Sequence, residues 1–135
     1  MIKKTLFLTL FTLANYTVSS LVYAQKSLTE CESEQDEEEA RLSRCLDGVK
    51  DTQDRKLQTW VNNHTFNLEE KALVTGRYSA LKMFKRSQSN FITFRDNNCR
   101  WQYLAISPEK GAGIAYKKCY ILVTQARIKE LSEVK

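Results

Sequence analysis

Apolar residues recur at intervals of three and four over most of this chain. In residues 34–61 the apolar positions are Leu42, Leu46, Val49, Leu57 and Trp60, with polar Gln53 in the gap. Since residues three and four apart lie on one face of an α-helix, this spacing predicts a first helix. Its acidic start suits the positive end of the helix dipole. We expect it to end at residues 62–65, which are turn formers and include His64.

Two further stripes predict two further helices. Over residues 68–105 the stripe consists of Leu73, Tyr78, Leu81, Phe84, Phe91, Phe94, Trp101 and Leu104. We expect these side chains to form the core and Gly76, which costs a helix about 1 kcal/mol relative to Ala, to mark a bend. After a break at residues 107–111, a third helix over residues 113–134 carries Tyr116, Tyr120, Val123, Ile128 and Leu131. Short loops make neighbouring helices antiparallel, so the pattern predicts an all-α antiparallel three-helix bundle.

The first 24 residues have the pattern of a secretory signal peptide. A basic start precedes an apolar run over residues 5–18, and a small-residue cleavage pattern ends at Ala24. A retained anchor is the alternative, but it needs about 20 consecutive apolar residues, and polar residues interrupt the run from Asn15 onward. Residue 25 is Gln, so no cysteine follows the cleavage site for acylation. We expect one bacterial domain over residues 25–135, periplasmic or secreted, with no stable membrane insertion after cleavage.

Four cysteines lie in this domain, at Cys31, Cys45, Cys99 and Cys119. An even number of cysteines in a small exported chain indicates two disulfides. A zinc site is the alternative, but zinc ligands usually come in close pairs, whereas the intervals here are 14, 54 and 20 residues. We therefore expect no metal and no other cofactor.

Loop symmetry predicts how the cysteines pair. Cys99 and Cys119 each lie 10 residues from Glu109, so they face each other in an antiparallel hairpin. A disulfide between them adds about 3 kcal/mol by the chain-entropy relation. In one unbroken helix Cys31 and Cys45 would be about 21 Å apart, too far to bond. Their pairing, which we favour, requires the chain before residue 40 to fold back. In the alternative arrangement, Cys31 and Cys45 each form a disulfide with one of Cys99 and Cys119.

Charge is distributed unevenly along the chain. The net charge is +5, or +3 without Lys3 and Lys4, yet residues 30–54 hold ten acids and three bases. We expect this segment to attract the basic helices, although exposed ion pairs contribute only about 0–1 kcal/mol each. The most acidic run of this segment is a candidate surface for binding a partner protein. The alternative is that it is a helix face in contact with solvent. The residues concerned are Glu34, Glu37, Glu38 and Glu39.

No catalytic constellation can be assigned from the residues. His64 is the only histidine, and cysteines held in disulfides supply no nucleophilic thiolate. We therefore expect a protein that is not an enzyme, and the basic residues form no compact motif for nucleic acid. Arg95, Asp96 and Arg127 lie near the last two cysteines, which predicts an interhelical salt-bridge network, with a ligand or partner contact as the alternative.

The C-terminal motif resembles the LprI-type family of lysozyme inhibitors, which are exported bacterial domains. The family pattern has two aromatic residues, Arg-Asp, Cys, two glycines, a second Cys, and then Thr, Arg and Leu. The matching residues are Phe91, Phe94, Arg95, Asp96, Cys99, Gly111, Gly113, Cys119, Thr124, Arg127 and Leu131. Upstream, Asp54 and Leu57 match an Asp-x-x-Leu element. Phe91 replaces the usual Trp, and Tyr120 replaces the Leu after the last cysteine.

The resemblance implies an all-helical, disulfide-bonded, exported protein and, for some family members, inhibition of lysozyme. Lysozymes that attack bacteria are commonly cationic, so the acidic segment offers a docking face, while the net charge of the domain opposes long-range steering. We predict a non-enzymatic binding protein that inhibits a lysozyme. The alternative is a periplasmic structural or accessory module that binds another envelope protein or peptidoglycan.

Overall fold

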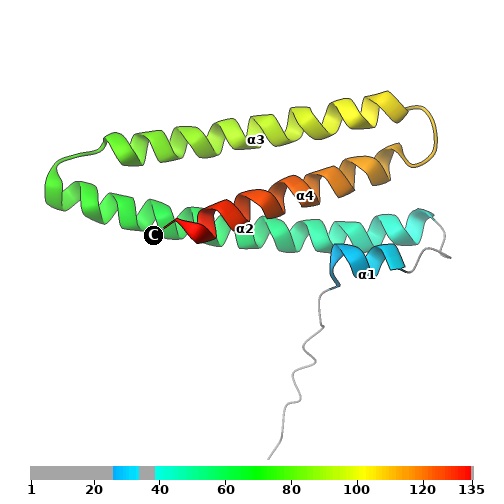
Figure 1. Cartoon of the computed structure of the whole chain (residues 1–135), viewed down its shortest axis with the longest axis horizontal. Helices are drawn as coiled ribbons and strands as arrows, with labels where there is room; N and C mark the ends of the chain where they lie inside the picture. The colour runs from blue at the N-terminus through cyan, green and yellow to red at the C-terminus, as the bar shows by residue number, and fades with distance from the viewer. Residues whose placement is uncertain (1–25, 34–38, 135) are drawn as a thin grey trace, which may run out of the picture.

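The computed structural model describes residues 26–33 and 39–134. These residues form four helices and no strand: α1 (Leu28–Ser33), α2 (Glu39–Thr75), α3 (Ser79–Ile106) and α4 (Ala112–Glu133). The three long helices run antiparallel in chain order, and α1 lies against the start of α2 (Figure 1). The predicted all-helical fold is therefore confirmed, with α1 as an addition. The predicted signal peptide and Glu34, Glu37 and Glu38 lie outside the described residues.

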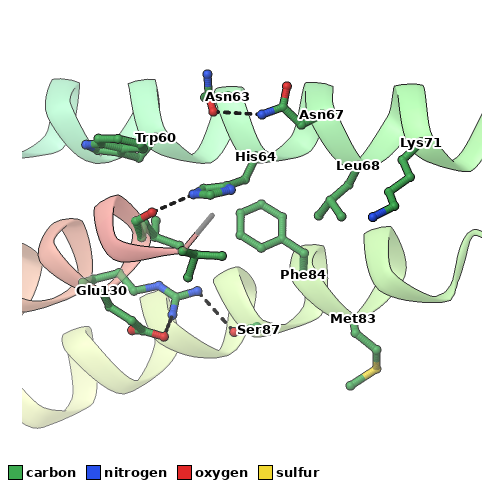
Figure 2. Close-up of a pocket in the computed structure, with 13 residues that line it drawn as sticks. Trp60, Asn63, His64, Asn67, Leu68, Lys71, Met83, Phe84, Ser87 and Glu130 are labelled. Atoms are coloured by element: carbon green, nitrogen blue, oxygen red, sulfur yellow. Dashed lines mark hydrogen bonds and ion pairs between the residues drawn. The ribbon is translucent and has the colours of Figure 1, made fainter.

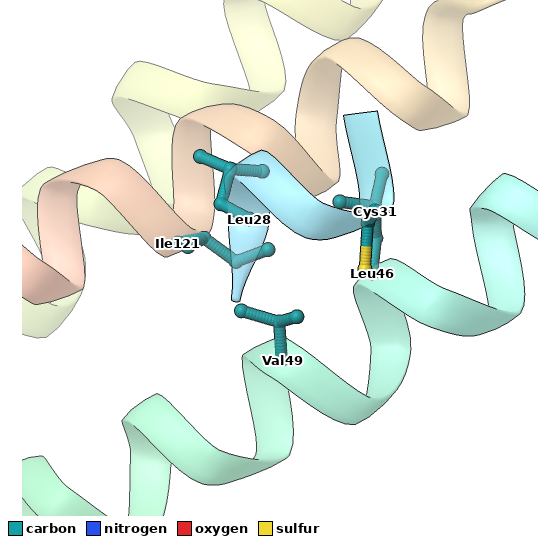
Figure 3. Close-up of a cluster of buried hydrophobic side chains, with 5 residues drawn as sticks. All are labelled: Leu28, Cys31, Leu46, Val49 and Ile121. Carbon is teal, nitrogen blue, oxygen red and sulfur yellow. The ribbon is translucent and has the colours of Figure 1, made fainter. Parts of the chain in front are cut away.

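Helix α4 is the centre of the bundle. It packs against both α2 and α3, whereas α2 and α3 contact each other much less. Ile121, in the N-terminal half of α4, is fully buried against Leu46 and Val49 of α2 and Leu28 of α1 (Figure 3). Burial of such aliphatic side chains stabilises a fold by about 1.5–3 kcal/mol each. This apolar cluster holds α1, α2 and α4 together at one end of the molecule.

Two disulfides join the helices. Cys31 pairs with Cys45, with their Cα atoms 5.8 Å apart, and Cys99 pairs with Cys119, with a Cα separation of 5.5 Å. These are the pairs that the sequence spacing favours. The first bond ties α1 back onto α2, as the fold-back geometry requires. The second joins α3 to α4 and is completely or almost completely buried.

The predicted turn at residues 62–65 is wrong, because α2 continues through this segment to Thr75. The stripe of buried or half-buried positions passes unbroken through Leu57, His64, Leu68 and Ala72. Asn67 Nδ2 also donates to Asn63 Oδ1 at 3.1 Å, one turn earlier in the same helix. Packing on α4 thus overrides the turn propensity of this segment. The chain instead reverses just after α2, at Gly76, where φ is +70°, a conformation that glycine adopts without strain.

The predicted aromatic core of the second helix is also partly wrong. Phe94, Trp101 and Leu104 are 57%, 60% and 59% exposed, whereas Arg95 and Cys99 are buried. The inward face of α3 passes through Leu81, Phe84, Gln88, Phe91, Arg95, Cys99 and Gln102. Because a single helix, α4, covers α3, only a narrow stripe is buried, and much of that stripe is polar.

Candidate functional site

A polar network links all three long helices at mid-bundle. Asp54 of α2 accepts hydrogen bonds from the Tyr120 hydroxyl of α4, at 3.0 and 3.1 Å to its two oxygens. Arg95 Nη1 of α3 donates to Asp54 Oδ1 at 3.2 Å and to Thr124 Oγ1 of α4 at 3.2 Å. Lys50 Nζ lies 3.5 Å from the other Asp54 oxygen. One carboxylate therefore fixes the relative positions of α2, α3 and α4.

Tyr120 lies at the centre of this network. The Arg95 guanidinium stacks 3.8 Å from the Tyr120 ring centroid, a favourable cation–π geometry. Burial raises the pKa of the Tyr120 phenol far above its usual value, the hydrogen bond to Asp54 adds to the rise, and the charge of Arg95 opposes it. The phenol therefore keeps its proton above the pH at which a free tyrosine ionises, and it remains a donor to Asp54.

The structure separates Asp96 from Arg127. Asp96 is exposed, and its carboxylate lies 3.5 Å from Arg95 Nε. Arg127 instead reaches across to α3, where it donates to Ser87 and Gln88, each at 3.2–3.3 Å, and pairs with Glu130 at 2.7 Å. The Phe91 ring lies between the two guanidiniums, 5.7 Å from that of Arg95 and 5.6 Å from that of Arg127.

The two motif glycines have different conformations. Gly111 begins α4 with φ at +87°, and its N–H donates to Glu39 Oε1 at 3.1 Å. Glu39 thereby satisfies a free N–H at the positive end of α4. Gly113 lies within the first turn of α4 and has no positive φ. Of the candidate acidic surface, Glu39 is thus the described member, and its side chain is bound within the chain.

An acid of α1 and an acid near the start of α2 also pair with lysines of α4. Lys117 Nζ lies 2.7 Å from Asp47 Oδ2, and Lys118 Nζ lies 2.8 Å from Glu32 Oε1. The expected attraction between the acidic segment and the basic helices is therefore present. These ion pairs also use part of the negative charge of the acidic segment, residues 30–54, that offers a docking face.

An open groove of about 780 Å³ lies where α4 ends between α2 and α3. His64 Nε2 donates to the backbone carbonyl of Leu131 at 2.8 Å, because a carbonyl oxygen can only accept. The His64 ring lies between Trp60 and Phe84, with centroid separations of 6.0 and 5.7 Å (Figure 2). The prediction of His64 as a turn residue is wrong, since it fastens the end of α4 to the middle of α2.

The described residues assemble no recognisable catalytic group. His64 has no serine, cysteine or carboxylate as a hydrogen-bond partner in this part of the chain, and every cysteine is in a disulfide. Within the same residues, no cluster of His, Cys, Asp or Glu is arranged to hold a metal ion. Across residues 26–33 and 39–134 no helix is both long and apolar enough to cross a membrane.

Sequence reasoning missed the central roles of Asp54 and Tyr120. Asp54 lies three residues before buried Leu57 and four after Lys50, so its position on the inward face of a helix was a usable signal. The sequence pattern presents Tyr120 only as a position on the apolar stripe of the third helix and as a departure from the family pattern. A tyrosine hydroxyl that is buried usually finds an acceptor, and Asp54 is that acceptor.

The fold and this network define a small, disulfide-bonded, all-α domain whose buried polar groups bind the helices to one another. A family model described as lysozyme inhibitor LprI matches residues 31–131. The chain therefore belongs to the LprI lysozyme inhibitor family. No curated protein matches the chain, and no solved structure does.

Proposed function

We propose that this protein is an exported, non-enzymatic binding protein that inhibits a lysozyme. The observation that carries the proposal is the family match over residues 31–131, which includes both disulfides and nearly all of the three long helices. Export agrees with the disulfides, which persist in oxidising compartments, and with the signal-peptide pattern of the first 24 residues.

The internal contacts favour a rigid binding body over a catalyst. Asp54 binds both Arg95 and Tyr120 between the helices, so the contacts of these three residues hold the shape of the domain. Inhibition then depends on surface residues that this body presents. A rigid surface loses little conformational entropy on binding.

The surface that we propose for lysozyme is the acidic run at Glu34, Glu37 and Glu38, next to Glu39. The chain on both sides of this run is fastened, by the disulfide of Cys31 and Cys45. Carboxylates complement a cationic enzyme at short range. Because the domain has a net positive charge, we expect contact at close approach and little long-range steering.

The test is muramidase activity against cell walls, measured for several lysozyme types with residues 25–135 in excess. We expect inhibition of at least one type. The triple variant E34Q/E37Q/E38Q should weaken inhibition about tenfold or more, since charge-assisted contacts contribute about 1.5–3 kcal/mol each. The control E70Q/E109Q/E133Q removes the same number of carboxylates elsewhere, at three exposed positions, and should inhibit normally.

Two results would count against parts of the proposal. Unchanged muramidase activity with every lysozyme type would remove the inhibitor function. Normal inhibition by E34Q/E37Q/E38Q would retain the function but place the lysozyme contact elsewhere on the surface.

The groove beside His64 favours a second candidate function, an accessory module that binds peptidoglycan. Its wall combines the aromatic rings of Trp60 and Phe84 with the amides of Asn63 and Asn67, groups that suit a sugar or peptide. Sedimentation with insoluble cell walls, without lysozyme, tests this function. Protein that stays in the supernatant at every wall concentration would exclude it.

A further inference from the structure

The α2–α3 hairpin extends beyond the end of α4. At about 1.5 Å per residue, the 37 residues of α2 span about 55 Å and the 22 residues of α4 about 33 Å. The hydrogen bond from His64 to the Leu131 carbonyl marks where α4 ends along α2. The last turns of α2 and the first turns of α3 therefore project as a two-helix tip without a third helix (Figure 1).

Apolar side chains are exposed at the reversal of this tip. Leu73 is 75% exposed, Val74 is 84% exposed and Tyr78 is 43% exposed. All three lie within three residues of Gly76, where the chain turns. Scattered apolar residues on a surface are ordinary, but here they gather at the projecting end of the molecule.

Basic residues surround these apolar side chains. Residues 66–86 contain five basic and two acidic residues. Lys85 pairs with Glu69 at 2.9 Å, which leaves Glu70 as the remaining acid. The other cations are Lys71, Arg77, Lys82 and Arg86, all exposed. The tip thus has an apolar end and a cationic collar.

The shape of the tip decides between a protein partner and a lipid surface. A stable protein interface buries about 800 Å² on each partner, which requires a broader face than the end of two helices. An anionic bilayer accepts a narrow apolar end into its headgroup and acyl boundary, while Lys and Arg contact the lipid phosphates. Tyrosine suits that boundary because its ring is apolar and its hydroxyl is polar.

We propose that the α2–α3 tip is a peripheral docking site for anionic phospholipid membranes. Leu73, Val74 and Tyr78 enter the interface, and the cationic collar binds the headgroups, with no helix crossing the bilayer. The site is separate from the acidic run proposed for lysozyme. A negative result for membrane binding would therefore leave the proposed inhibition of lysozyme unaffected, and the reverse also holds.

The test is sedimentation of residues 25–135 with vesicles of phosphatidylglycerol mixed with phosphatidylcholine, against vesicles of phosphatidylcholine alone. We expect binding to the anionic vesicles that weakens as salt rises, because each basic residue near such a surface contributes a screened attraction. The variant L73S/V74S removes two apolar anchors, so its affinity for the anionic vesicles should fall about tenfold or more. The variant K71Q/R77Q/K82Q should lose most of the salt dependence.

A matched control is L104S/L122S, which replaces two other exposed aliphatic residues, 59% and 54% exposed, away from the tip. It should bind vesicles as the original chain does. Insertion depth gives a second measurement, because brominated lipids quench the fluorescence of a tryptophan that enters the bilayer. The variant V74W should be quenched more strongly than the original chain, which contains Trp60 and Trp101. The variant L104W should show no such additional quenching. Circular dichroism shows whether each variant remains folded. Absence of binding to anionic vesicles, or equal binding by L73S/V74S, would overturn the proposal.

Discussion

The Tyr120 hydroxyl donates to both carboxylate oxygens of Asp54, at 3.0 and 3.1 Å, and thereby joins α4 to α2. Arg95 from α3 binds the same carboxylate and also stacks on the Tyr120 ring. The three side chains come from positions 54, 95 and 120, which are remote in sequence. Their mutual contacts fix how far along its axis each long helix lies relative to the other two.

Replacement of Arg95 by alanine tests the energetic weight of this cluster. The change removes the hydrogen bonds to Asp54 and Thr124 and the stacking on Tyr120, and it leaves Asp54 without its buried cationic partner. We expect the free energy of unfolding to fall by about 3 kcal/mol, measured by urea denaturation. Arg100→Ala, on the exposed face of the same helix, should change it by less than about 0.5 kcal/mol. Similar values for both variants would contradict a special role for Arg95.

Tyr120 predicts a loss of stability at alkaline pH. Its phenol keeps its proton in the folded state because its pKa is raised, whereas the unfolded chain loses that proton near pH 10. The unfolded state then binds fewer protons than the folded state, so stability falls as pH rises above about 10, by up to about 1.4 kcal/mol per pH unit. Below that pH this group contributes no slope.

The variant Tyr120→Phe isolates this effect. We expect it to be about 1 kcal/mol less stable at neutral pH, since it loses the hydrogen bond to Asp54, and to lack the alkaline slope due to Tyr120. Denaturant titrations between pH 7 and about 11 measure both quantities. Tyr103→Phe, at a more exposed position, should retain that slope. Parallel pH profiles for Tyr120→Phe and the original chain would refute the expectation.

The two disulfides should differ in their effects. The double variant C99S/C119S should lower the free energy of unfolding of the whole domain by about 3 kcal/mol, because that bond fixes α3 against α4. The variant C31S/C45S should mainly release α1, because α1 contacts the body through a few residues such as Leu28. Hydrogen exchange of residues 28–33 measures the second effect. Equal exchange rates with and without that bond would contradict it.

The motif glycines should respond oppositely to alanine. Gly111→Ala places a Cβ at a φ of +87°, which should destabilise the protein by about 1–2 kcal/mol. Gly113→Ala lies in a helical turn with open space around the added Cβ, so it should stabilise by up to about 1 kcal/mol. Thermal unfolding of both variants gives the comparison. If both variants lost the same amount of stability, the difference in backbone conformation between the two glycines would not explain their effects.

Local spacing in the sequence was enough to predict three long antiparallel helices and the Cys99–Cys119 bond, but not α1 or the start of α3, since residues 68–75 belong to α2. The loop symmetry about Glu109 depends only on antiparallel helices of regular rise, and regular rise is a property of every α-helix. The end of the first helix was mispredicted because Asn62, Asn63 and Thr65 favour turns in isolation. Their helical state depends on packing against α4, where the contact of His64 is with Leu131, 67 residues away in the chain.

The candidate site was harder to predict because its inward residues are polar. Hydrophobic periodicity assigns Phe94 and Trp101 to the core and treats Gln88 as a gap. In the structure Gln88 binds Arg127, and buried Arg95 donates through Nη1 to both Thr124 and Asp54. Which polar residue faces inward depends on partners from other helices, and single-sequence periodicity contains no information about those partners.

The bond between Cys31 and Cys45 has a consequence for proteolysis. It closes residues 31–45 into a covalent ring that includes the acidic run. A protease that cuts once between the two cysteines opens the ring but separates no fragment, since α1 stays attached through the sulfur atoms. A molecule nicked in this way keeps its full mass under non-reducing conditions, and its α1 stays tethered beside Leu46, Val49 and Ile121.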